Sequence, residues 1–162
     1  MQRKIIYPVN FGVTYAGKQN DCSVRALCNV TGIPYNTSEM MHKLNGRITN
    51  KGTSISTLQK TYKEAGVELV GIYGDTQTAW ALRNQLEYTD LQENKGITLQ
   101  NFIKKNPEGK YICLVRGHAL AVVDGEVVDA TTAVLANKRI TAVFKPVSAA
   151  KAMLLEMDNE ES

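Results

Sequence analysis

The sequence lacks long apolar runs, and its number of cysteines is odd. No stretch approaches the roughly 20 apolar residues of a membrane-spanning helix. The opening, MQRKIIYPVNFG, holds an apolar run of about five residues, too short for the core of a signal peptide. Three cysteines argue against a disulfide framework and for a reducing compartment. We therefore expect a soluble, cytoplasmic protein that is not exported by its own signal.

A strong charge of one sign is also missing. The 19 basic and 16 acidic residues give a formal net charge of +3, and the basic residues are scattered without interleaved aromatic side chains. Nucleic acid and membrane surfaces are therefore not expected as partners. Zinc is not expected either, because the cysteines and histidines lack Cys-x-x-Cys and His-x₃-His spacings.

The length and composition fit one globular domain. The chain has 162 residues, of which 43% are apolar and 22% charged. We assign a single domain to residues 1–148 and expect the C-terminal tail, 149–162, to be partly disordered. Helical patterns come first and strand patterns later, which predicts an α+β fold with N-terminal helices and a C-terminal antiparallel sheet.

Apolar spacing and capping residues place the elements. Helices are predicted within 20–32, 36–46, 54–66, 75–88 and 98–109, and β-rich segments at 67–74, 110–117, 118–130 and 139–147. Side chains suited to cap the helices precede four of them: Asn20 or Asp21, Asn36 or Thr37, Ser54, and Thr98.

One hairpin can be given a register from the sequence. Asp124-Gly125 predicts a two-residue type I′ turn, which pairs Val123 with Glu126 and, further along, Leu120 with Asp129. Side chains alternate along a strand, so His118 shares a face with Leu120, and Asp129 lies diagonal to it. Asp129 can therefore orient the His118 imidazole, whereas Asp124 in the turn is too far away.

Cys22 is the candidate nucleophile. It lies in the first turn of the first predicted helix, where the helix dipole and free N–H groups favour a thiolate. Cys28 and Cys113 lie in apolar surroundings and are expected in the core. His42 is expected to be an exposed or half-buried helix residue. The remaining polar and aromatic candidates are assigned to ordinary roles: solvated charge for Arg25 and Arg116, and packing for Trp80.

Two segments that carry these residues resemble the papain-like cysteine peptidases. NDCSVRALCNVTGIPY and TLQNFIKKNPEGKYICLVRGHALAVVDGEVVDA resemble a group of small papain-like proteins of bacteria and their phages, and together cover about a third of the chain. QNDCSVRAL also resembles the nucleophile segment of bacteriocin-processing peptidases. The resemblance implies a papain-like fold, Cys22 as nucleophile, His118 as general base and acid, and Asp129 as the orienting group. If the protein is phage-encoded, its compartment is the host cytoplasm.

The oxyanion hole departs from the papain pattern. The family's glutamine lies six residues before the cysteine, where this chain has Ala16. Gln19 and Asn20 are nearer, and either side chain can donate to an oxyanion together with the Cys22 backbone N–H. The spacing does not choose between them.

These residues predict a cysteine peptidase or amidase that acts on a protein or peptide through a thioester, without metal or organic cofactor. A transglutaminase-like or deamidating enzyme would use the same triad, because only the acceptor differs. A binding or adaptor protein that keeps the fold without turnover is the alternative outside enzymes. The sequence does not indicate the oligomeric state.

Overall fold

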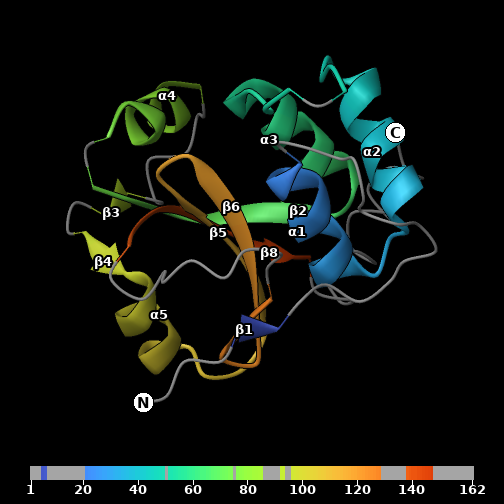
Figure 1. Cartoon of the computed structure of the whole chain (residues 1–162). Coiled ribbons are helices and arrows are strands. Elements are labelled where there is room, and N and C mark those ends of the chain that lie inside the picture. The colour runs from blue at the N-terminus through green and yellow to red at the C-terminus, as the bar shows by residue number, and fades with distance from the viewer. Residues whose placement is uncertain are drawn as a thin grey trace, which may run out of the picture.

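A computed structural model of the chain describes residues 5–6, 21–49, 51–74, 76–85, 92–93, 96–128 and 138–147. Within these residues the chain forms five helices and a largely antiparallel sheet, which confirms the predicted α+β class (Figure 1). The predicted tail, 149–162, lies outside the described residues. None of the described helices is long and apolar enough to cross a membrane.

The elements follow the predicted order. The helices are α1 (Cys22–Thr31), α2 (Tyr35–Leu44), α3 (Ile55–Glu64), α4 (Gln77–Gln85) and α5 (Leu99–Lys105). The longer strands are β2 (Val67–Tyr73), β5 (Lys110–Val115), β6 (His118–Val123), β7 (Glu126–Val128) and β8 (Arg139–Pro146). Three two-residue strands were not predicted: β1 (Ile5–Ile6), β3 (Gln92–Glu93) and β4 (Ile97–Thr98).

The strands form one sheet in the order β1-β7-β6-β5-β8-β2-β3, with β4 paired to β8. The pairs in the middle of the sheet are antiparallel, as predicted, whereas the outer pairs β1–β7 and β2–β3 are parallel. The predicted hairpin register is confirmed over its three described pairs, from Val123 with Glu126 to Ala121 with Val128. Positive φ angles of 49° at Asp124 and 79° at Gly125 suit the predicted turn.

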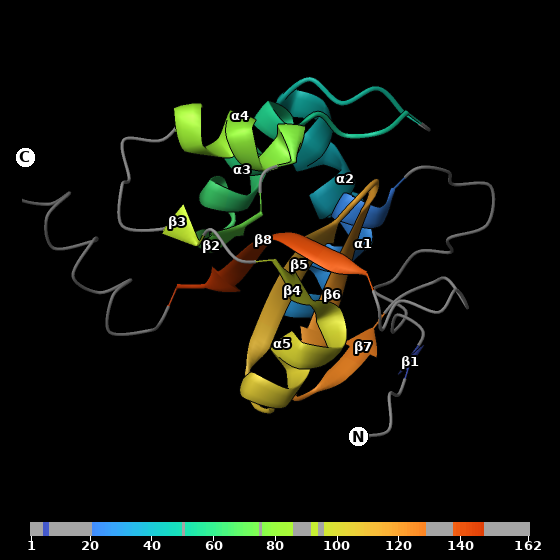
Figure 2. The same cartoon turned by 90° about the vertical axis from the view of Figure 1, so that its left-hand side faces the viewer.

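Apolar side chains fill both faces of this sheet. Leu114 of β5 belongs to a cluster with Leu27 of α1, and its neighbour Cys113 belongs to a second cluster with Phe102 of α5. Consecutive strand residues face opposite sides, so the two clusters lie on opposite faces. Figure 1 shows α1, α2 and α3 gathered on one side of the sheet and α5 on the other, and Figure 2 shows α4 beside α3.

Helix starts were predicted correctly in part. Ser54 and Thr98 cap α3 and α5 through their side chains, as expected. Asp21 occupies the N-cap position of α1, but its side chain does not cap the helix. The caps predicted for α2 were wrong: the helix begins at Tyr35 after Pro34, so Asn36 and Thr37 lie inside its first turn. Proline before a helix supplies a suitable φ without needing a hydrogen-bonded N–H.

Candidate active site

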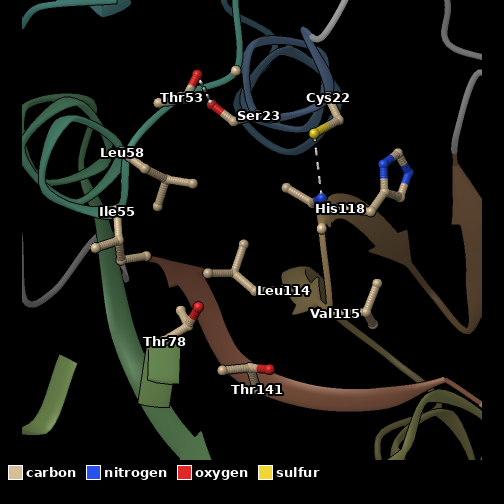
Figure 3. Close-up of a pocket in the computed structure, with 13 residues that line it drawn as sticks. Cys22, Ser23, Thr53, Ile55, Leu58, Thr78, Leu114, Val115, His118 and Thr141 are labelled. Carbon is tan, nitrogen blue, oxygen red and sulfur yellow. Dashed lines mark hydrogen bonds between the residues drawn. The ribbon is translucent and has the colours of Figure 1, made fainter. Parts of the chain in front are cut away.

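Cys22 is the first residue of α1 and is half-buried. Its sulfur accepts a hydrogen bond from the backbone N–H of Ala119 in β6, at 3.4 Å (Figure 3). Residues 97 positions apart in sequence are thus in direct contact. This contact fixes the sulfur at the start of the strand that carries the candidate histidine.

His118 is the first residue of β6 and lies in the same pocket as Cys22. Gly117 has a φ of 73°, a left-handed conformation that glycine adopts without strain, and it turns the chain from β5 into β6. His118 therefore lies at the turn end of the β5–β6 pair, opposite Val115. Figure 3 shows the ring beside the sulfur. The structure brings together two of the residues that the sequence singled out.

The pKa of the Cys22 thiol is lowered. Burial is the largest single influence and raises it, but the hydrogen bond and positive charge of His118, with backbone N–H groups of Ala119 and Ser23, outweigh burial. A lowered thiol pKa increases the fraction of thiolate, which is the nucleophilic form. The start of α1 adds the partial positive charge of a helix N-terminus.

The other two cysteines have a different environment. Cys28 and Cys113 are fully buried in the apolar core, as predicted. Burial raises the pKa of Cys28 to about 11 and raises that of Cys113 as well. Both therefore stay protonated and shielded at neutral pH, and Cys22 is the cysteine suited to nucleophilic chemistry.

A pocket with a volume of about 260 Å³ opens beside the Cys22 sulfur. Its described lining comes from α1, α3, α4, β5, β6 and β8 and from the segments before α3 and β6. Figure 3 shows Ile55 and Leu58 of α3 on one side and Leu114 of β5 near the middle. Cys22 and His118 are the titratable side chains among the described lining residues.

A buried polar network holds the start of α1 against α2. The Asp21 carboxylate accepts hydrogen bonds from the Tyr35 hydroxyl at 2.5 Å and from Arg25 Nε at 3.0 Å. This use of the carboxylate explains why it does not cap the helix. The interpretation of Arg25 as a solvated charge was wrong, because its side chain is 16% exposed and forms an ion pair with Asp21. Burial and the neighbouring Asp21 raise the pKa of Tyr35.

A second polar contact next to Cys22, between Ser23 and His42, was not predicted from the sequence. His42 was expected to be exposed or half-buried, but it is fully buried. Its Nδ1 lies 2.7 Å from the Ser38 carbonyl oxygen, so Nε2 is left to accept from the Ser23 hydroxyl at 2.6 Å. Tyr35, Ser38 and His42 follow a spacing of three and four residues, which is the signal that could have placed His42 on the buried face of α2.

The remaining predicted site residues, Asp129, Gln19 and Asn20, lie outside the described residues. Asp124 is described, and its carboxylate accepts a hydrogen bond from the Gly109 N–H at 3.0 Å. Asp124 therefore bridges two turns, in agreement with the inference that it does not orient His118. No group of three or more metal-binding side chains occurs in the described part of the chain.

We found no protein-family model, curated protein or solved structure that matches this chain. The arrangement of Cys22 and His118 therefore carries the functional argument. A thiol with a lowered pKa beside an imidazole, in an open pocket, can attack a carbonyl carbon and transfer a proton.

Proposed function

We propose that this protein is a papain-like cysteine peptidase or amidase. The observation that carries the proposal is the shared pocket of the half-buried Cys22 thiol and the His118 imidazole, with a thiol pKa lowered despite burial. The resemblance of the two segments to papain-like proteins supports the same conclusion. Asp129 is the proposed orienting group for His118.

The proposed reaction has two steps. The Cys22 thiolate attacks the carbonyl carbon of an amide, and the carbonyl oxygen becomes an oxyanion held by the Cys22 N–H and by Gln19 or Asn20. The C–N bond then breaks as protonated His118 gives its proton to the leaving amine. His118 next removes a proton from water, which attacks the thioester and releases the acid and the thiolate. No metal or organic cofactor takes part.

The experiment that tests the thiolate–imidazole pair is alkylation by iodoacetamide from pH 5.5 to 9, followed by mass-spectrometric peptide mapping. We expect Cys22 to be labelled well below pH 8, because a thiolate is already present there. Cys28 and Cys113 provide internal controls in the same sample and are expected to stay unlabelled in the folded protein.

Two variants make this test specific. His118→Ala is expected to move Cys22 labelling toward the profile of a free thiol, whose pKa is about 8.5. Arg116→Ala is the matched control, because Arg116 is exposed in the same turn before β6. If wild-type Cys22 titrated like a free thiol, or if His118→Ala left the profile unchanged, the enzyme proposal would be wrong and a binding role would be favoured.

Hydrolysis and transfer to an amine start from the same thioester. Products distinguish them: a peptidase shortens its substrate, a deamidase adds about 1 Da to a glutamine side chain, and a transglutaminase cross-links it. Intact-mass analysis of a candidate substrate, with and without added amine, separates the three outcomes.

A further inference from the structure

The end of the pocket away from His118 carries two threonine hydroxyls, from Thr141 of β8 and Thr78 of α4 (Figure 3). Thr141 is only 5% exposed, whereas Thr78 is half-buried in the first turn of its helix. Within the described residues, neither hydroxyl takes part in any hydrogen bond. Both hydroxyl oxygens are accessible from the pocket, since neither is among the fully buried, unpartnered polar atoms of the described residues. A ligand group that covers them must supply hydrogen bonds, or it leaves them unpaired.

A β-bulge accounts for the position of Thr141. Leu114 of β5 pairs with Ala142, and the next residue, Val115, pairs with Ile140. Thr141 is therefore the extra residue on β8, opposite no residue of β5. Bulges occur next to active sites because they redirect a side chain that regular alternation would place elsewhere. Here the bulged residue lines the pocket that begins at the Cys22 sulfur.

The pocket between the sulfur and the two hydroxyls has apolar walls. Ile55, Leu58 and Leu114 line it, and no Lys, Arg, Asp or Glu occurs among its described lining residues. A charged substrate group would lose its hydration here without gaining a counter-charge from these residues. A purely apolar group would fill the walls but leave both hydroxyls unpaired.

We propose that this pocket binds a substrate side chain with an apolar stem and an uncharged hydrogen-bonding end, and that glutamine is the amino acid that it selects. The two methylenes of glutamine match the apolar walls. Its carboxamide both donates and accepts hydrogen bonds, as threonine hydroxyls do. Thr78 and Thr141 are then specificity-determining residues for the acyl side of the substrate. This inference rests on the proposed function, because it names the substrate of the same thiol.

The test uses peptidyl acyloxymethyl ketones, which alkylate a catalytic thiolate irreversibly. In the first series the residue directly before the ketone varies, and in the second series the residue one position earlier varies. The variable residue is glutamine, glutamate, methionine or lysine in both. In one of the two series, we expect the ketone with glutamine to alkylate Cys22 at least about tenfold faster than the ketones with glutamate or lysine. We expect it to react about two- to tenfold faster than the ketone with methionine, which is the range of one or two hydrogen bonds. Equal rates for glutamine and methionine in both series would overturn the inference.

Three threonine-to-valine variants assign the effect. Thr141→Val and Thr78→Val keep the side-chain shape but remove the hydroxyl, and each is expected to reduce the preference for glutamine over methionine about two- to tenfold. Thr31→Val is the matched control, because the Thr31 hydroxyl bonds the Leu27 carbonyl outside the pocket. An unchanged preference in both pocket variants would assign selection to other residues and overturn the inference.

Iodoacetamide separates this inference from the proposed function. The reagent has no peptide side chain, so its pH profile at Cys22 is expected to be the same in the wild type and in all three threonine variants. A Cys22 that reacts at low pH with iodoacetamide but shows no side-chain preference retains the proposed function and overturns the glutamine pocket alone. A Cys22 without low-pH reactivity overturns both.

Discussion

The three thiols of this chain differ in pKa because each sulfur has different surroundings. Cys22 and Cys28 belong to the same helix, yet the pKa of the first is lowered and that of the second is raised to about 11. Among the contacts within the described residues, Cys22 alone of the three has both an imidazole beside it and an N–H donor from a neighbouring strand. A cysteine at a helix start becomes reactive through such partners and not through its position alone.

Ser23 and His42 form a buried pair whose strength is expected to depend on pH. Burial is the main cause that lowers the pKa of His42, and the nearby Arg47 lowers it further, although the Ser38 carbonyl raises it. The unfolded chain then binds a proton on this residue more readily than the folded chain does. The free energy of unfolding is therefore expected to fall as the pH drops below about 6.5, the ordinary histidine value.

The variant His42→Ala tests this dependence. At pH 8 we expect it to lower the free energy of unfolding by about 1–3 kcal/mol, because the Ser23 hydroxyl loses its acceptor. The difference from the wild type should shrink toward pH 5, where the wild type itself is penalised for keeping His42 neutral. Urea unfolding at both pH values measures the two differences. Equal differences at pH 8 and pH 5 would contradict the assignment of a neutral, buried His42.

At the level of single residues, the sequence predicted what depends on local pattern. The pairing of strands β6 and β7 came from turn chemistry, and the core positions of Cys28 and Cys113 came from their apolar surroundings. Cys22 and His118 became candidates through their places at a helix start and a strand start, together with the resemblance of their segments to papain-like proteins. The place of Thr141 in the pocket could not be predicted, because no glycine or other residue in RITAVF marks a bulge. The bulge that turns its side chain into the pocket arises only when β8 pairs with β5.

Helix α3 depends on its cap. The Ser54 side chain accepts a hydrogen bond from the Thr57 backbone N–H at 3.3 Å, and the helix carries the pocket residues Ile55 and Leu58. We expect Ser54→Ala to lower the free energy of unfolding by about 1 kcal/mol. Lys60→Ala is the control, because Lys60 is exposed on the same helix and alanine favours helix. Urea unfolding in which Ser54→Ala was as stable as Lys60→Ala would contradict the role of the cap.

The turn between β6 and β7 requires glycine. Gly125 has a φ of 79°, and an added Cβ would lie 3.3 Å from the Pro107 carbonyl oxygen. Gly125→Ala is therefore expected to lower the free energy of unfolding by at least about 1–2 kcal/mol. Gly52→Ala is the matched change at a glycine with ordinary φ and no atom within 4 Å, and it should be neutral or stabilising. Thermal unfolding of the two variants is expected to rank them in that order.

Helix ends show why elements are predicted better than their limits. Ser54 and Thr98 gave the correct starts because their side chains do cap. Asn36 and Thr37 are equally good caps by composition, but α2 starts earlier, at Tyr35 directly after Pro34. The Tyr35 hydroxyl also donates to Asp21, at the N-cap position of α1. Neighbouring residues thus offer several helix starts, and the sequence pattern alone did not rank them.

On the scale of the whole molecule, the candidate site exists only through the packing of α1 on the sheet. The sequence predicted helices first and strands later, but it did not place β8 between β5 and β2 or add the parallel strands β1 and β3. Strand order depends on which faces the helices cover, so it is a property of the folded core. The same core brings Cys22 to Ala119, and site and fold should therefore be lost together.

This coupling is measurable without mutation. In urea at pH 6.5, we expect Cys22 labelling to fall when the chain unfolds, because the thiol loses His118 and regains an ordinary pKa of about 8.5. At pH 8.5 the labelling of Cys28 and Cys113 should rise at the same urea concentration, because the burial that protects them ends. Domains of this size usually unfold in one cooperative transition. Quantitative peptide mapping across the urea series follows all three thiols.

A loss of Cys22 reactivity at a much lower urea concentration than the exposure of Cys28 would contradict this coupling. It would mean that α1 separates from β6 while the core persists, and that local contacts alone hold the sulfur in place.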